Sequence, residues 1–274
     1  MKSENMLLMK HVSKTFHPGT VNEKCALDDV ELVLKKGDFA TIVGSNGAGK
    51  STLFNAITGA FFVDKGLIML DGEDITYRKE YVRSKVIGHL FQDPLKGTAP
   101  HMTIEENMVL AYLRASTSKN AYFSRIRAAD KKKFREQLAL LGMGLEDRMK
   151  NPVGLLSGGQ RQALTLLMAT MVTPKILLLD EHTAALDPAT AEKVLNLTKQ
   201  IVAERQITCL MVTHNMHQAL ELGNRTLMMD GGRIVLDVSG DERSRMTVED
   251  LLSEFAKRAG KELDNDRILA TVKK

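Results

Sequence analysis

The most constraining feature of the chain is a glycine-rich segment at residues 44–52, which reads Gly-Ser-Asn-Gly-Ala-Gly-Lys-Ser-Thr. It matches the pattern G-x-x-x-x-G-K-[ST] at every fixed position. A β-prone run at residues 38–43 precedes it, and residues 52–58 form a helical pattern that ends near Gly59. A strand, a glycine-rich turn and a helix in this order predict a loop whose backbone N–H groups surround a phosphate group.

The residue types in this segment explain its spacing. Glycine adopts backbone dihedrals that are closed to other residues, which lets successive N–H groups point at an anion. Lys50 adds a positive charge for the β and γ phosphates, and the Ser51 hydroxyl is a suitable ligand for Mg²⁺. The alternative, a glycine-rich turn before an ordinary helix, leaves this register of strand, lysine and hydroxyl unexplained. The predicted nucleotide-binding residues are Gly44, Ser45, Asn46, Gly47, Ala48, Gly49, Lys50, Ser51 and Thr52.

Composition bounds the class of protein. The chain has 274 residues, of which 43% are hydrophobic and 26% charged, enough for one large domain or two small ones with a sizeable core. The net charge of +4 permits a membrane-surface or nucleic-acid partner without requiring one. Cys25 and Cys209 lack a metal-like spacing, which favours a reduced cytoplasmic setting. No apolar run approaches the roughly 18 residues that span a bilayer, so we expect another chain to supply any membrane channel.

The remaining pattern outlines an α/β fold. The first part is rich in β-prone runs around the single loop helix, and a helical insertion begins near residue 102. In the second half, apolar strands alternate with helices, which predicts a parallel sheet with helices on its faces. Strands are expected at residues 6–16, 26–34, 38–43, 67–70, 87–91, 176–179, 207–212, 226–229 and 233–238, and a charged helical tail from residue 246.

A strand that ends in two carboxylates is the second chemical signal. Residues 176–179 form a continuous apolar run, and Asp180 and Glu181 follow it directly. We expect Asp180 to hold Mg²⁺, through water, beside the phosphate loop. Glu181, one residue further on, is suited to polarise the attacking water as a general base.

The third signal is Leu-Ser-Gly-Gly-Gln at residues 156–160. Ser157 followed by two glycines can begin a helix at residues 161–171 and so create a second anion site rich in N–H groups. A simpler reading is an N-cap serine in a glycine-rich turn. Because one chain rarely needs two γ-phosphate sites, we expect the second site to serve the nucleotide of another subunit. Its residues are Ser157, Gly158, Gly159 and Gln160.

With these three signals in this order, the sequence resembles the ATP-binding subunits of ABC transporters over residues 6–240. The resemblance implies an α/β fold with a P-loop NTPase core and a mixed or parallel sheet. It also implies an N-terminal antiparallel β layer and a helical insertion that carries the signature motif. We expect an ABC ATPase domain at residues 1–240, a helical subdomain at about 95–170 and a C-terminal helical tail at 241–274.

The resemblance implies further site residues. Gln92 matches the glutamine that approaches Mg²⁺ and the attacking water, and His214 matches the switch histidine that contacts the γ-phosphate. Asp187 matches the loop that crosses the dimer interface, and it can also cap the next helix. Phe16 lies where an aromatic ring stacks on adenine, with a core phenylalanine as the alternative. The expected cofactors are ATP and Mg²⁺, with Ser51, Gln92 and Asp180 at the metal and Glu181, His214 and Gln92 in catalysis.

Two positions depart from the family pattern. His182 replaces a proline that commonly follows the catalytic glutamate, and it could add a titratable group beside Glu181. Ala184 or Ala185 replaces the commonest serine of the crossing loop. Neither change removes a ligand to phosphate or metal.

The implied function is an ATP-hydrolysing subunit that energises solute transport through a separate membrane permease, and amino-acid uptake is the transport process that the resemblance suggests. The expected partners are a second copy in a head-to-tail ATP sandwich, an integral membrane permease and a solute-binding protein, with no nucleic acid. The expected location is peripheral, on the cytoplasmic face of the cell membrane. A soluble single-cassette ABC ATPase acting in cofactor assembly is the alternative.

Overall fold

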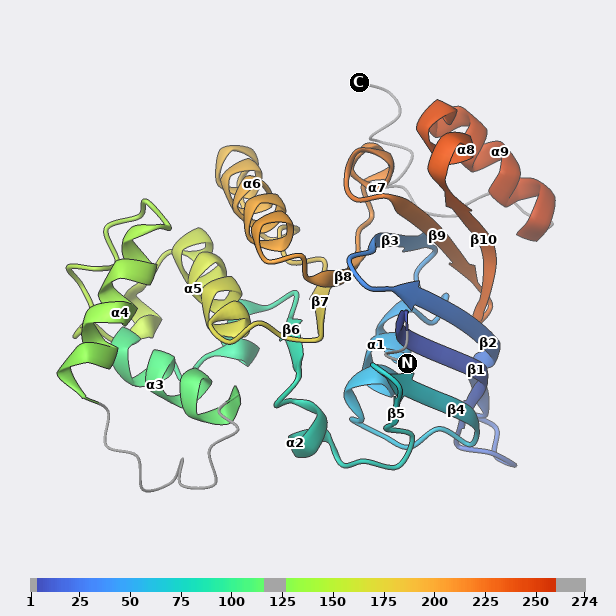
Figure 1. The fold of residues 1–274 in the computed structure, drawn as a ribbon. Coiled ribbons are helices and arrows are strands. Elements are labelled where there is room, and N and C mark those ends of the chain that lie inside the picture. Colours follow the sequence, from blue (N-terminus) through green and yellow to red (C-terminus); the bar gives the residue numbers. More distant parts are fainter. Residues whose placement is uncertain (1–3, 116–126, 260–274) are drawn as a thin grey trace. The chain divides into compact units, whose positions relative to one another are not determined.

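The computed structural model describes residues 4–115 and 127–259, and it forms two compact units (Figure 1). Unit 1 combines the residues up to Arg83 with those from Gln206 onward, and unit 2 spans Ser84–Arg205. Residues far apart in the sequence therefore share unit 1. Among the described residues, no helix is both long enough and apolar enough to cross a membrane.

An antiparallel sheet forms the first layer of unit 1, with strand order β2-β1-β4-β5. Its register places Leu8 of β1 opposite Val33 of β2 on one side and Met69 of β4 on the other. Leu7 and Met9 on β1 are fully buried, as expected when alternate residues face a core. The strands are β1 (Asn5–Phe16), β2 (Lys24–Lys35), β4 (Lys65–Leu70) and β5 (Glu73–Asp74), which confirms the predicted antiparallel layer.

The strand before the phosphate loop lies in the middle of the second sheet of unit 1. There β3 pairs in parallel with both β8 and β9, and β10 closes the hairpin antiparallel to β9. Every residue of β3 is buried, which explains its continuous apolar run. The strands are β3 (Phe39–Gly44), β8 (Thr208–Val212), β9 (Arg225–Asp230) and β10 (Arg233–Ser239).

The last described helix belongs to the core of unit 1. Leu251 and Phe255 are fully buried in a cluster with Met216, Met228 and Val238. Their spacing of four residues puts both side chains on one helix face, so a segment that reads as a charged tail also has an apolar side. The helices of unit 1 are α1 (Lys50–Thr58), α2 (Glu80–Arg83), α7 (Met216–Glu221), α8 (Gly240–Arg245) and α9 (Val248–Ala259).

Buried arginines stabilise the carboxyl ends of two helices in unit 1. Arg83 donates hydrogen bonds to the carbonyls of Ala56 and Ile57 in the last turns of α1. Arg243 donates in the same way to the carbonyls of Ala219 and Leu222 at the end of α7. The last carbonyls of a helix lack partners within the helix and carry partial negative charge, so a guanidinium satisfies both needs.

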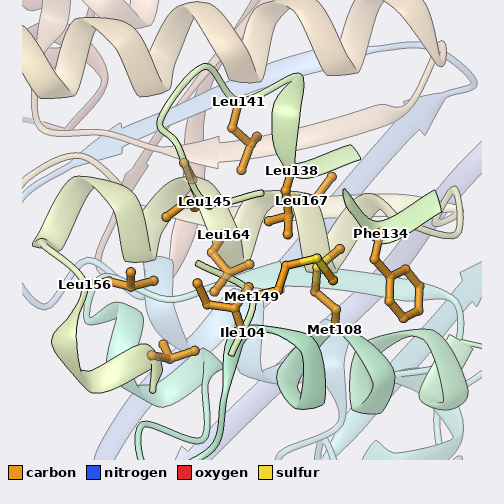
Figure 2. Close-up of a cluster of buried hydrophobic side chains, with 12 residues drawn as sticks. Ile104, Met108, Phe134, Leu138, Leu141, Leu145, Met149, Leu156, Leu164 and Leu167 are labelled. Carbon is orange, nitrogen blue, oxygen red and sulfur yellow. The ribbon is translucent and has the colours of Figure 1, made fainter. Parts of the chain in front are cut away.

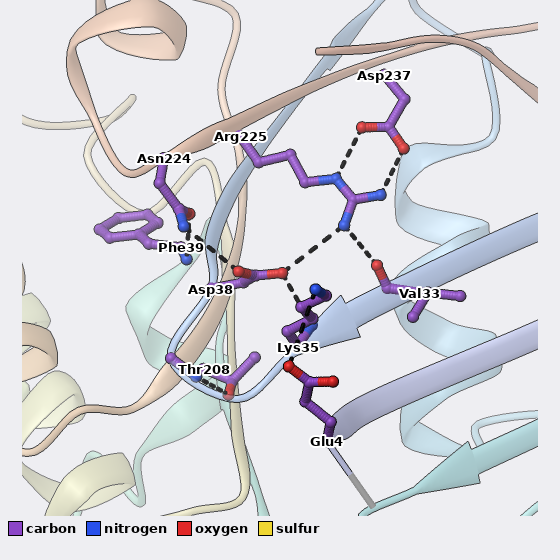
Figure 3. Close-up of polar contacts among 10 residues, drawn as sticks. Glu4, Val33, Lys35, Asp38, Phe39, Thr208, Asn224, Arg225 and Asp237 are labelled. Atoms are coloured by element: carbon purple, nitrogen blue, oxygen red, sulfur yellow. Dashed lines mark hydrogen bonds and ion pairs between the residues drawn. The ribbon is translucent and has the colours of Figure 1, made fainter. Parts of the chain in front are cut away.

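A polar network ties four strands together at the amino ends of β3 and β9 (Figure 3). Arg225, the first residue of β9, forms a bidentate pair with Asp237 of β10 and lies 3.7 Å from the carboxylate of Asp38. It also donates to the carbonyl of Val33 on β2. The hydrogen bonds from its guanidinium to Asp237 raise the pKa of Arg225. This edge is opposite the phosphate loop, so the network supports the sheet and leaves the site free.

Unit 2 combines a pair of parallel strands with a cluster of helices. Strand β6 (Ile87–Leu90) pairs with β7 (Ile176–Asp180), with Leu90 opposite Leu179. Ile104, Met108, Phe134, Leu138 and Leu164 join three helices in one apolar cluster (Figure 2). The helices of unit 2 are α3 (Ile104–Ala115), α4 (Ala128–Ala139), α5 (Gly158–Thr170) and α6 (Pro188–Glu204). Phe134 and Leu138 lie one helical turn apart on α4, and Leu141, which follows the end of α4, is buried in the same cluster.

Candidate nucleotide site

The glycines of the phosphate loop are required by contact as well as by conformation. Gly49 has φ 105°, and a Cβ atom there would lie 2.7 Å from the carbonyl oxygen of Ala26. A Cβ atom at Gly44 would lie 2.2 Å from the carbonyl oxygen of Met229. Both approaches are too close for any side chain. The loop is thus packed between the start of β2 and the end of β9, and at Gly44 and Gly49 there is no room for a residue larger than glycine.

Lys50 and Ser45 make the loop a suitable phosphate site. Lys50 is buried, and its Nζ donates to the carbonyls of Gly44 at 2.7 Å and Ser45 at 2.9 Å. The ammonium is therefore held over the loop. The Oγ of Ser45 is buried and has no hydrogen-bond partner among the described residues. A phosphate oxygen would satisfy this hydroxyl and the first N–H groups of α1, so the residues present fit the phosphates of ATP.

Phe16 and Lys24 flank the loop at the end of the β1–β2 pair. They are opposite each other in the strand register, and Phe16 packs edge-to-face on Phe61 with ring centroids 5.3 Å apart. The ring is half-buried, so it has an aromatic neighbour and an accessible side. The Nζ of Lys24 lies 3.7 Å from the position that a Cβ atom would take at Gly47. Sequence reasoning missed Lys24, because no local pattern indicates that β2 starts beside the loop.

His214 lies at the same sheet edge as the phosphate loop. It follows β8, whose parallel neighbour β3 ends at Gly44, and the N–H of Thr213 donates to the carbonyl of Ile42. Parallel strands present their carboxyl ends at one edge, where ligands bind in α/β folds. The next residue, Asn215, caps α7 by accepting a hydrogen bond from the N–H of Gln218. The half-buried His214 therefore lies between two fixed neighbours in the sequence, Thr213 on the sheet and Asn215 at the helix cap.

Within unit 2, the structure brings Gln92 and Glu181 together. Gln92 follows β6 and Glu181 follows β7, so both lie beyond the carboxyl ends of paired strands. The Nε2 of Gln92 donates to the Oε2 of Glu181 over 3.2 Å. Asp180 is the last residue of β7 and is half-buried. These carboxylate and amide oxygens are of the type that Mg²⁺ prefers.

His182 turns away from this polar edge into the core. Its ring is 2% exposed, and its Nε2 lies 3.1 Å from the hydroxyl of Thr198 on α6. Burial lowers the pKa of His182 to about 4. The imidazole is therefore neutral near pH 7, and it packs against α6 where sequence reasoning had suggested a titratable group beside Glu181.

Ser157 caps α5 through a reciprocal pair of hydrogen bonds. The N–H of Gln160 donates to the hydroxyl of Ser157, and the N–H of Ser157 donates to the side-chain oxygen of Gln160. This arrangement is a capping box, so the N-cap interpretation of the motif is confirmed. A Cβ atom at Gly159 would lie 2.0 Å from the Cγ2 of Thr190, which explains a glycine where α5 meets α6. The first N–H groups of a helix lack acceptors within the helix, so the start of α5 has the chemistry of an anion site.

Asp187 caps α6, as its position before Pro188 predicts. Its carboxylate accepts a hydrogen bond from the N–H of Thr190 at 3.1 Å. Hydrogen bonds from Thr190 lower the pKa of Asp187. Asp187 is exposed and lies at the end of the loop that starts at Glu181. A single residue therefore both ends that loop and begins the helix against which His182 packs.

Comparison with known proteins assigns the family. A family model described as ABC transporter matches residues 27–184. The chain belongs to this family. The matched region includes the phosphate loop, the signature motif and the carboxylates at the end of β7.

Several curated relatives are similar over nearly the whole chain. The tyrosine transport ATP-binding protein of Clostridioides difficile (strain R20291) is 42% identical over 255 residues, which covers 91% of this chain and 98% of that protein. The phosphonates import ATP-binding protein PhnC of Lactobacillus gasseri is 32% identical and covers 95% and 98% of the two chains. This chain is the ATP-hydrolysing subunit of an ABC transporter and energises solute transport.

Solved structures of ATP-binding cassettes share the fold. The ADP conformation of the cassette MJ1267 superimposes with a TM-score of 0.75 at 28% identity, covering 94% of this chain and 98% of that one. The cassette MJ0796, solved as a dimer bound to ADP and Pi, gives a TM-score of 0.74 at 28% identity and covers 85% and 98%. The predicted α/β fold with a P-loop NTPase core is confirmed.

Proposed function

We propose that the chain binds and hydrolyses ATP, with a separate role for residues of each unit. In unit 1, the loop from Gly44 to Thr52 binds the phosphates, Phe16 stacks on the adenine and His214 contacts the γ-phosphate. In unit 2, Glu181 takes a proton from the attacking water, and Gln92 orients that water. The observation that carries the proposal is the loop itself, in which the buried Lys50 is hydrogen-bonded to two loop carbonyls and the buried hydroxyl of Ser45 has no hydrogen-bond partner among the described residues.

We propose Ser51, Gln92 and Asp180 as the residues that hold Mg²⁺. They supply a hydroxyl, an amide and a carboxylate oxygen, which is the donor chemistry that this ion selects. Bound there, Mg²⁺ would neutralise charge on the β and γ phosphates. The few protein ligands agree with the tendency of Mg²⁺ to bind through one or two carboxylates, substrate phosphates and water.

A second copy of the chain completes the site in this proposal. Two copies face head to tail, and each ATP lies between Lys50 of one copy and Ser157 of the other. Two features support this. The start of α5 is a second helix N-terminus suited to an anion, and the structurally similar cassette MJ0796 has been solved as a dimer. Asp187 lies at the edge of the same interface.

We further propose that the dimer is peripheral, bound on the cytoplasmic face of the cell membrane to an integral permease and working with a solute-binding protein. Curated relatives named for tyrosine, methionine and phosphonate transport support a small-solute cargo, and the tyrosine relative favours an amino acid. In this scheme, residues 1–240 form the ABC ATPase domain, with a helical subdomain at about 95–170 and a C-terminal helical tail at 241–274. Residues 1–3, 116–126 and 260–274 of these ranges lie outside the described residues.

Affinity purification from detergent-solubilised membranes tests the scheme. The full chain is expected to retain a polytopic membrane protein, and vesicles that contain both are expected to take up a labelled aromatic amino acid when ATP is supplied. A Lys50→Ala variant is the control, because it keeps the partner-binding surface and loses the charge at the phosphates. Uptake of a phosphonate in place of the amino acid would reject the proposal that the cargo is an amino acid. Failure to retain any membrane protein would reject the transport complex.

A further inference from the structure

His182 occupies a position that the proposed chemistry does not use. It directly follows Glu181, yet its ring is 2% exposed and contacts the middle of α6. Its partner Thr198 is 1% exposed and is the sixteenth residue after His182 in the sequence. The pair therefore connects the end of β7 to a separate element of unit 2.

The hydrogen bonds of Thr198 determine which atom of the ring carries the proton. The Thr198 hydroxyl donates its only hydrogen to the carbonyl of Val194 at 2.9 Å. Its oxygen is then free only to accept, so the Nε2 of His182 must donate to it over 3.1 Å. The Nδ1 atom is unprotonated, and it has no partner among the described residues. The histidine is thus a neutral, directional anchor.

This anchor adjoins a backbone conformation that needs support. Glu181 has φ 45°, in the left-handed region that residues with side chains seldom occupy. The N–H of Ala184 donates to the carbonyl of Glu181 at 2.9 Å, which closes a tight turn on one side. On the side of the carboxylate, Gln92 donates to Oε2. A strained residue keeps its conformation only when its neighbours determine it, and His182 is the neighbour that is fixed in the core.

We propose that His182 is a positioning residue that, through its hydrogen bond to Thr198, holds Glu181 in the conformation in which its carboxylate meets Gln92. The inference rests on the proposed role of Glu181 as the general base. It explains why a buried polar ring occupies the position after the glutamate. The side chain fastens the turn to α6, while a proline there would restrict the turn through its own fixed φ.

The test separates positioning from packing. Thr198→Val keeps the shape and removes the acceptor, and His182→Leu removes the donor. Each is expected to lower kcat for ATP hydrolysis about tenfold, because a small displacement of a catalytic group costs much of its rate. The KM for ATP is expected to stay within about twofold, because the phosphate loop is untouched. His182→Gln, which can place an N–H near the same hydroxyl, is expected to restore most of kcat.

Thr170→Val is the matched control, because Thr170 is fully buried in α5 and donates to the carbonyl of Leu166 just as Thr198 donates to Val194. It is expected to lose similar thermal stability and to keep wild-type kcat. Wild-type kcat in folded Thr198→Val and His182→Leu would overturn the proposal, as would an equal fall of kcat in Thr170→Val.

Glu181→Gln distinguishes failure of the proposed role of Glu181 as general base from failure of the positioning role of His182. If that variant hydrolyses ATP normally, the role of Glu181 fails. If it is inactive while Thr198→Val is normal, only the positioning role fails.

Discussion

The side-chain amide of Gln92 donates a 3.2 Å hydrogen bond to the carboxylate of Glu181 across the ends of two paired parallel strands. The two residues are 89 positions apart in the sequence. Their meeting follows from the pairing of Leu90 with Leu179, which brings the following residues to the same edge of the sheet. A water bound beside this pair would have the Glu181 carboxylate as a proton acceptor and the Gln92 amide as a group that orients it.

The first prediction concerns Glu181→Gln. The change keeps the size of the side chain and removes the base, so ATP hydrolysis is expected to fall by at least about 100-fold. ATP binding is expected to remain, because Lys50 and the loop are unchanged. The variant should therefore accumulate as a dimer in size-exclusion chromatography with ATP and Mg²⁺. A monomeric variant with normal turnover would contradict the assignment.

The second prediction concerns Gly49→Ala. The new Cβ atom would lie 2.7 Å from the carbonyl oxygen of Ala26, and the backbone has φ 105°. We expect loss of ATP binding, measured by calorimetry, and a stability loss of about 1–3 kcal/mol from the strained conformation. Gly37→Ala is the control, because Gly37 also has positive φ but has open space around it. Its variant should lose stability and keep the affinity for ATP. Equal affinities in both variants would show that the close approach is unimportant.

The third prediction concerns the pH dependence of stability. Burial lowers the pKa of His89 from 6.5 to about 4. The unfolded chain then binds a proton at His89 more readily than the folded chain does. The stability that comes from keeping His89 neutral is therefore fully present above pH 6.5, and it is lost as the pH falls towards 4. His89→Phe is expected to reduce the fall in unfolding free energy between pH 7 and pH 4 by on the order of 2 kcal/mol. Denaturant melts at several pH values measure it, and an unchanged pH profile would contradict it.

The fourth prediction concerns the helix α9. Phe255 is fully buried against the sheet of unit 1, so Phe255→Ala is expected to cost about 3–5 kcal/mol of unfolding free energy. Ser253→Ala, on the exposed side of the same helix, should change stability by less than about 0.5 kcal/mol. If both variants melt like the wild type, α9 does not contribute to the stability of the unit.

Local features of the site could be predicted from the sequence because each depends on a few neighbouring residues. The phosphate loop needs glycines, a lysine and a hydroxyl at set spacing, and the caps at Ser157 and Asp187 need a short polar side chain before a helix. In each case the chemistry lies within one turn of the chain, and the structure shows it at the expected residues.

Other features were decided by contacts between distant segments. Lys24 lies beside Gly47 because the β1–β2 pair ends there. Arg83 and Arg243 donate hydrogen bonds to the last carbonyls of helices to which they do not belong. In a sequence, isolated arginines of this kind look like surface residues. The apolar face of α9 becomes part of a core only because β10 lies beneath it.

The sequence by itself determined that this chain binds a nucleotide phosphate and which strand carries the acids, because backbone geometry and side-chain chemistry at short range are sufficient for both. Only the tertiary structure decided that Gln92 meets Glu181 and that His182 is joined to Thr198. Those pairings depend on strand register and on the packing of α6. Both are set when segments that are distant in the sequence bury apolar surface against each other. The loop could be recognised from its residues, while the support of the glutamate became visible only in the fold.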